Sequence, residues 1–167
     1  MLLKIYKTLL IFLLSLILVA CSTKHVSIAP STNLKLVADN VVVKVVGQNI
    51  NSTVLDKLTH EINDQLIIAG FNTEKETETE TDKRINLNVY VTAFTPGNTA
   101  LRMTVGFGAG RGSLLYTAEY TNQVGQTLAK MDGNERFVGG WFSEGEEVAT
   151  EVLINDAGRH IVDLALK

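Results

Sequence analysis

The chain of 167 residues contains one cysteine, two prolines and three histidines. A single cysteine excludes an internal disulfide and a cysteine-based metal site. The histidines, His25, His60 and His160, fall in three different predicted elements. The sequence therefore predicts no metal site and no cofactor, and the fold has to depend on its apolar core.

Basic clusters are also missing. The formal net charge is −3, and removal of the first 20 residues, which carry two lysines and no acid, lowers it to −5. An acidic chain without a basic patch argues against nucleic acid as a partner and against electrostatic binding to anionic lipid. The chain has no G-x-S-x-G elbow, no H-E-x-x-H motif and no carboxylate pair in a plausible cleft. We therefore expect no catalytic residue and no enzyme.

One long apolar run is present, and it lies at the N-terminus. Lys4 and Lys7 precede residues 9–20, which are apolar except for Ser15. A helix needs about 20 apolar residues to cross a bilayer, so this run is too short for that and is typical of a signal peptide. We predict a signal peptide over residues 1–20.

The apolar run ends in Leu18-Val19-Ala20-Cys21, which resembles a bacterial lipobox. The Cys21 thiol is the nucleophile that takes a diacylglyceryl group, and several acyl chains, such as palmitate, anchor a protein firmly. Alternatives are an ordinary cleaved signal with a chance cysteine, or an N-terminal membrane anchor. Ser22 follows in place of Asp, and by resemblance to Gram-negative lipoproteins this favours the outer membrane, facing the periplasm.

The remaining 147 residues suffice for one domain and a tether. Residues 21–40 are polar and include Pro30, so we predict a lipidated tether there. We assign residues 41–167 to a single globular α/β domain.

The first half of that domain predicts a strand, a helix and two more strands. Near-continuous valines over residues 41–46 indicate a strand buried on both faces. Apolar residues at helical spacing predict a helix over residues 54–69, with Asn51, Ser52 or Thr53 as N-cap and Gly70 at its end. A short strand over residues 71–73 and a half-buried one over residues 85–93 follow. Between them, residues 74–82 alternate acid and threonine, which favours a solvated loop or exposed hairpin over a weak calcium site.

The second half predicts strands and a terminal helix. A strand begins at Leu101, another covers residues 114–121, and a return strand over residues 126–131 ends at a turn in residues 132–134. Trp141 and Phe142 suit the edge of the core better than a ligand shelf. Ser143 and Glu146 form a capping box ahead of a helix that runs to the C-terminus. Gly158 in the middle of this helix permits close packing.

Residues 106–113 place glycine at every second position. They match neither a P-loop nor a dinucleotide fingerprint, because no lysine follows and a strand replaces the helix. In an extended chain the glycines share one bare face, which suits close approach by the protein's own elements or by a partner. A bulged loop is the third alternative. The hypothetical partner-binding residues are Gly106, Phe107, Gly108, Gly110 and Arg111.

The segment Thr104-Val105-Gly106-Phe107-Gly108-Ala109-Gly110, the strand over residues 114–121, the turn near Gly125 and the terminal helix resemble domain of unknown function 4410, a group of small bacterial lipoproteins. The resemblance implies an envelope location and an α/β fold, and it carries no catalytic residue.

We therefore expect an α+β (or α/β) fold, a mostly antiparallel twisted sheet with two long helices packed on one face. The expected function is a non-enzymatic outer-membrane lipoprotein that binds another cell-envelope component, with its membrane contact through the lipid on Cys21. The alternatives are a self-assembling subunit of an envelope transport or secretion complex, and a small-ligand or lipid carrier with a deep apolar pocket.

Overall fold

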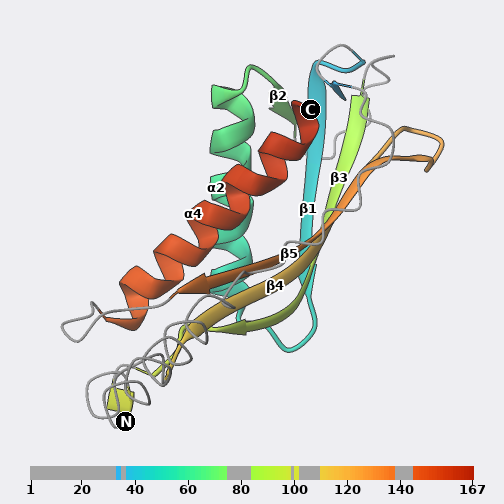
Figure 1. Ribbon diagram of the computed structural model, residues 1–167. Coiled ribbons are helices and arrows are strands. Elements are labelled where there is room, and N and C mark those ends of the chain that lie inside the picture. Colours follow the sequence, from blue (N-terminus) through green and yellow to red (C-terminus); the bar gives the residue numbers. More distant parts are fainter. Residues whose placement is uncertain (1–32, 35–36, 75–83, 99, 102–109, 138–144) are drawn as a thin grey trace, which may run out of the picture.

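A five-stranded sheet and two long helices form two layers in the computed structural model (Figure 1). The structure describes residues 33–34, 37–74, 84–98, 100–101, 110–137 and 145–167. The elements are β1 (Asn40–Gly47), α2 (Ser52–Ile68), β2 (Asn72–Glu74), β3 (Arg84–Thr95), β4 (Gly112–Thr121), β5 (Thr127–Phe137) and α4 (Glu146–Ala165). The fold class is α+β.

The sheet is mixed, with the strand order β2-β1-β3-β4-β5. β1 pairs in parallel with both β2 and β3, whereas β3–β4 and β4–β5 are antiparallel. The prediction of a mostly antiparallel sheet is therefore wrong for the β2–β1–β3 half. The cause is that α2 carries the chain back along β1, so that β2 starts at the same end of the sheet as β1.

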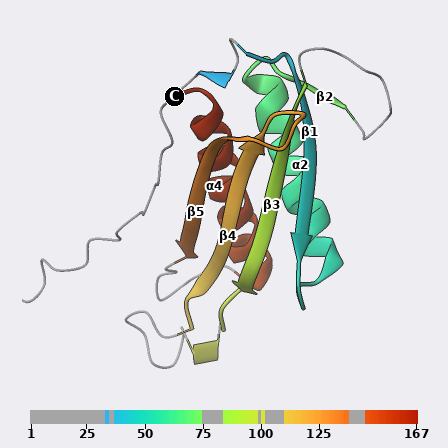
Figure 2. The same cartoon turned by 90° about the vertical axis from the view of Figure 1, so that its right-hand side faces the viewer.

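Both helices lie over the same face of the sheet, and the opposite face carries no helix among the described residues (Figure 2). This arrangement corrects the expectation that residues 41–46 are buried on both faces. Val41 and Val42 are buried, but Lys44 is exposed and Val46 is 37% exposed. The valine run reflects the preference of β-branched residues for strands rather than complete burial.

The predicted helix is α2, and its two ends are defined by hydrogen bonds. The Asn51 side-chain oxygen accepts a hydrogen bond from the Thr53 N–H at 2.9 Å, so Asn51 is the N-cap. Gly70 follows the helix with a φ of 85°, and the Phe71 N–H donates to the Leu66 carbonyl at 2.9 Å. This is the Schellman arrangement, which the glycine permits because it adopts a positive φ without steric cost.

The alternation predicted over residues 85–93 is confirmed in β3 up to Val91. Ile85, Leu87, Val89 and Val91 are all buried against the helices. A register shift follows Val91, and Ala93 is exposed instead of continuing the buried series. A bulge of this kind moves later side chains to the opposite face.

The strand expected to begin at Leu101 does not begin there. Ala100 and Leu101 are helical, and the Asn98 side-chain oxygen accepts a hydrogen bond from the Leu101 N–H at 3.0 Å. The rest of that expected strand, residues 102–105, lies outside the described residues.

The turn predicted at residues 132–134 is not a turn. β5 continues through Asp132, Gly133 and Asn134, which pair with Thr117, Tyr116 and Leu115 of β4. The preceding hairpin is where the sequence predicts it, and Gly125 there has a φ of 81°. The glycine in β5 has a packing role that is described below.

α4 begins at Glu146 with Gly145 as N-cap, later than the capping box at Ser143 predicts. Gly158 is buried where α4 crosses α2, and a Cβ atom there would lie 2.7 Å from Glu61 Cγ. The expected close packing at Gly158 is therefore present, and the partner is α2.

The core extends beyond the predicted domain start at residue 41. Leu34 is fully buried and Ala38 is buried, and both belong to the main core cluster. Leu34 and Ala38 therefore pack on the domain, although both lie within the residues predicted as tether. Among the described helices, none combines the length and the apolar character needed to cross a membrane.

Candidate functional site

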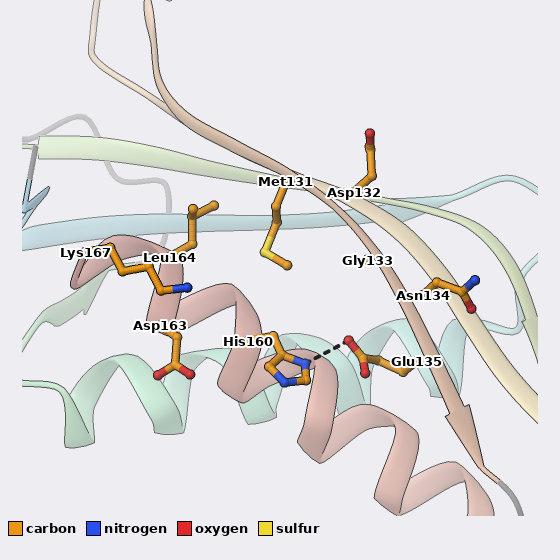
Figure 3. Close-up of a pocket in the computed structure, with 9 residues that line it drawn as sticks. All are labelled: Met131, Asp132, Gly133, Asn134, Glu135, His160, Asp163, Leu164 and Lys167. Atoms are coloured by element: carbon orange, nitrogen blue, oxygen red, sulfur yellow. Dashed lines mark hydrogen bonds and ion pairs between the residues drawn. The ribbon is translucent and has the colours of Figure 1, made fainter. Parts of the chain in front are cut away.

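A buried polar cluster joins β4, β5 and α4. The Tyr116 hydroxyl donates a hydrogen bond to Glu135 Oε1 at 3.1 Å, and His160 Nδ1 lies 2.8 Å from the same oxygen. Glu135 projects from the edge strand β5 toward α4, where it meets His160 (Figure 3). Glu135 is 7% exposed, so these two partners offset much of the cost of burying its carboxylate.

Gly133 makes room for the Tyr116 ring. The two residues are cross-strand partners, and a Cβ atom on residue 133 would lie 2.1 Å from Tyr116 Cζ. The ring therefore crosses the bare backbone of β5, which brings its hydroxyl to Glu135, two residues further along the same face. The cluster is a consequence of this register.

Burial raises the pKa of Tyr116 well above its usual range, and the nearby Glu135 carboxylate raises it further. The phenol therefore stays protonated further into the alkaline range than an exposed tyrosine does, and it acts as a donor. Tyr120 of β4 is similar: burial raises its pKa, and its hydroxyl donates to the Ile161 carbonyl of α4 at 3.1 Å. Tyr120 therefore connects the sheet to α4 directly, whereas Tyr116 does so through Glu135 and His160.

A pocket of about 110 Å³ opens beside the cluster, between β5 and α4 (Figure 3). Its lining residues are Met131, Asp132, Gly133, Asn134, Glu135, His160, Asp163, Leu164 and Lys167. Pockets for drug-sized ligands usually measure about 300–1,000 Å³, so this one is small. None of these lining residues is a serine, threonine or cysteine, and no group in the described part of the chain offers three metal-binding side chains of the His, Cys, Asp or Glu type.

The pairing of His160 with Glu135 is a feature that sequence reasoning missed. Because a turn was predicted at residues 132–134, Glu135 lay outside every predicted strand, and no partner was predicted for His160. The period-two series Ala129, Met131, Gly133 and Glu135 is the signal that identifies the strand. The contact between His160 and Glu135 therefore connects α4 to the edge strand β5.

The glycine stretch lies only partly within the described residues. Gly106, Phe107 and Gly108 lie outside them, as do Cys21, Trp141 and Phe142. Gly110 has a φ of 66° and its carbonyl accepts a hydrogen bond from the Asn98 N–H at 3.0 Å.

A Cβ atom on Gly110 would lie 2.3 Å from the Asn98 carbonyl oxygen, so contact within the chain explains this glycine. Arg111 next to it is exposed. Partner binding by the stretch stays a prediction.

The face of the sheet opposite the helices carries a mixture of polar and apolar side chains, and we call it the open face. Tyr90 of β3 is 47% exposed and is the cross-strand partner of Val46. On β4 and β5, Thr117 donates a hydrogen bond to Asp132 at 2.6 Å, and Glu119 lies opposite Lys130 in the strand register.

A hollow in the open face lies over β1 and β3. It is lined by Val42, Val43, Lys44, Arg84, Asn86 and Asn88. Arg84 Nε is hidden from solvent, and among the described residues nothing accepts a hydrogen bond from it. An unsatisfied buried donor is uncommon in folded proteins, so Arg84 is an exception among the described residues. The hollow itself, with its polar lining, makes this part of the open face a candidate contact surface.

These features describe a two-layer α+β domain with one covered and one open sheet face. The chain belongs to the family described as Domain of unknown function (DUF4410), which matches residues 28–140. The resemblance seen in the sequence is thereby confirmed. A comparison with curated proteins finds no match.

Solved structures share the fold. The PelC dodecamer from Paraburkholderia phytofirmans is 14% identical with a TM-score of 0.58, and the similarity covers 86% of this chain and 96% of that one. A point variant of that protein is 16% identical with a TM-score of 0.56 over the same shares. A further structure, an uncharacterized protein, is 14% identical with a TM-score of 0.50, covering 77% of this chain and 92% of that one. At these identities the similarity concerns the fold alone.

Proposed function

We propose that the protein is a non-enzymatic outer-membrane lipoprotein whose periplasmic domain binds another cell-envelope component. The lipobox that ends at Cys21 supports the anchor, and Ser22 supports the outer membrane. The domain begins to pack at residue 34, so roughly a dozen residues separate it from the anchor. The protein is thus held at the membrane by its lipid, with the folded part in the periplasm.

The open face is the observation that carries the binding role. Parallel strand pairs usually have both faces covered, yet β1 and β3 carry helices on one face only among the described residues. Tyr90 and Val46 lie exposed beside polar neighbours, a mixture typical of surfaces that bind a protein reversibly. The hollow over β1 and β3 adds the polar side chains of Lys44, Asn86 and Asn88, which a partner can contact.

The non-enzymatic assignment is supported by the small pocket between β5 and α4. Its one buried carboxylate, Glu135, already has Tyr116 and His160 as partners. These contacts explain the cluster as a structural link, and no reaction is needed to account for it.

Photo-crosslinking in intact cells tests the binding role. A crosslinking amino acid at Tyr90 reports on the open face, and one at Val152, which is 37% exposed on α4, is the matched control on the helix side. We expect a discrete crosslink to a different protein from position 90 and none from position 152. The proposal is contradicted if both positions give the same products or if neither gives any.

The glycine stretch provides a second position for the same experiment. A crosslinker at Phe107 tests the prediction that residues 106–111 contact the partner. Replacement of Gly108 by Val is expected to reduce partner binding and leave the fold intact, because the added side chain covers the bare backbone. Unchanged binding by the variant removes this stretch from the interface.

A second candidate function is a self-assembling subunit of an envelope transport or secretion complex. The observation that favours it is the fold shared with PelC, which is described as a dodecamer. Light scattering of the purified protein distinguishes the candidates. A monomer at micromolar concentration speaks against self-assembly, whereas a defined oligomer, together with a self-crosslinked ladder from Tyr90, supports it.

A further inference from the structure

Exposed aliphatic side chains gather at one end of the molecule. Ile67 and Ile68 at the end of α2 are 56% and 77% exposed, and Val37 and Leu166 are exposed as well. We call these four residues the apolar end. Val124, at the tip of the β4–β5 hairpin, lies at the same end of the sheet, since Thr121 pairs with Asn86 near the start of β3.

Hydrogen bonds tie the parts of the apolar end together. The Asn33 side chain donates to the Leu166 carbonyl at 3.4 Å, which joins the incoming chain to the end of α4. The Asn72 N–H donates to the Asp39 carbonyl at 2.8 Å, which joins the same segment to the chain leaving α2. Figure 2 shows the C-terminus, the end of α2 and the start of β1 at one end of the molecule.

The polypeptide that follows the proposed lipid anchor joins the domain at this same end, at Asn33. Asn33 follows Cys21 by twelve residues, which span at most about 40 Å when fully extended. A tether of this length keeps the domain at a high local concentration near the bilayer. A weak contact is therefore enough to orient the domain on the membrane.

We propose that the apolar end is a membrane-docking surface that rests on the bilayer carrying the lipidated Cys21. Ile67, Ile68, Val37 and Leu166 insert their side chains at the boundary between headgroups and acyl chains. Among the described residues, the exposed charged side chains near them include Asp39, Asp64, Asp163 and Lys167, three of which are acidic, so apolar insertion rather than attraction to anionic lipid provides the contact. The inference rests on the lipid anchor of the proposed function.

This orientation leaves the open face accessible. β1 starts at the apolar end and runs away from it, so Val46 lies at the far end of that strand and Tyr90 beside it. With the apolar end on the bilayer, the open face stands roughly upright and remains available to a partner in the periplasm.

Depth-dependent fluorescence quenching of the lipidated protein tests the docking surface. Acylation blocks Cys21, so a cysteine introduced by Ile68→Cys is the only free thiol, and Val46→Cys gives the matched control. Each variant is labelled with the environment-sensitive dye NBD and reconstituted in vesicles of phosphatidylethanolamine and phosphatidylglycerol that contain a nitroxide-labelled lipid. We expect a blue shift and strong quenching at position 68, and neither at position 46.

The outcomes separate this inference from the anchor. Mass spectrometry of the N-terminal peptide first establishes whether Cys21 is acylated; an unmodified peptide contradicts the proposed anchor and the docking surface with it. An acylated protein whose dye at position 68 stays unquenched overturns the docking surface alone. A blue shift that depends on protein concentration and not on vesicles assigns the apolar end to contact between copies of this chain, which also overturns it.

Discussion

Gly133 of β5 and Tyr116 of β4 are cross-strand partners, and the tyrosine ring occupies the space that a side chain on residue 133 would need. The phenol ring lies over the glycine, and this brings its hydroxyl to Glu135. Glu135 then holds His160 of α4. Glycine is usually associated with turns, but Gly133 lies within β5 and leaves the space in which the Tyr116 ring crosses this edge strand.

We predict that Gly133→Ala destabilises the protein. The new methyl group meets the Tyr116 ring, and overpacking of this kind costs about 1–3 kcal/mol in free energy of unfolding. Urea denaturation followed by circular dichroism measures the change.

The Tyr116→Leu background is the matched control for that change, because it removes the ring that the new methyl group meets. In a background that carries Tyr116→Leu, we expect the cost of Gly133→Ala to shrink, because the ring is gone. An equal cost in both backgrounds contradicts the proposed fit between ring and glycine.

The buried tyrosines predict a loss of stability at alkaline pH. Burial raises the pKa of Tyr116 and Tyr120, so above pH about 10 the unfolded chain releases protons that the folded chain keeps. The free energy of unfolding then falls by up to about 1.4 kcal/mol per pH unit for each tyrosine, and it is unaffected by them below that pH.

Urea midpoints measured between about pH 8 and pH 11 test this dependence. The Tyr120→Phe variant removes one of the two phenols together with its hydrogen bond to Ile161. We expect a lower midpoint than wild type near neutral pH and a shallower decline above pH 10. A decline as steep as that of the wild type argues against a role of Tyr120.

Among the helices and strands, the sequence predicted correctly those whose residue pattern depends on which of their own faces is buried. The alternation in β3 and the helical spacing in α2 were predicted correctly because each element buries one face. The burial of the valine strand on both faces and the turn at residues 132–134 were predicted wrongly, because helix coverage and strand register depend on distant residues. For the same reason, the pairing of Glu135 with His160 could not be predicted from either segment alone.

The N-cap of α2 is a feature that the sequence left open among three residues. We predict that Asn51→Ala lowers the free energy of unfolding by about 1 kcal/mol, because the Thr53 N–H loses its acceptor. Ser52→Ala is the neighbouring control and is expected to have little effect. Thermal unfolding of both variants measures the difference, and equal losses contradict the assignment of Asn51 as the cap.

On the scale of the whole molecule, three surfaces differ in character. The helices cover one face of the sheet, the open face exposes Tyr90, and the apolar end lies where the described chain begins at Asn33. Parallel pairing of β1 on both sides creates this layout, because it places the start of β1 beside the end of α2. The proposed anchor, orientation and binding surface thus form one consistent arrangement.

All of these proposals depend on the lipid at Cys21, so its attachment is the most direct test. Cells are grown with radioactive palmitate, and the wild-type protein is compared with the Cys21→Ser variant. We predict that the wild type is labelled and cleaved after Ala20, and that the variant is unlabelled and keeps its signal peptide. Label that persists in the variant, or a wild-type protein without label, contradicts the account.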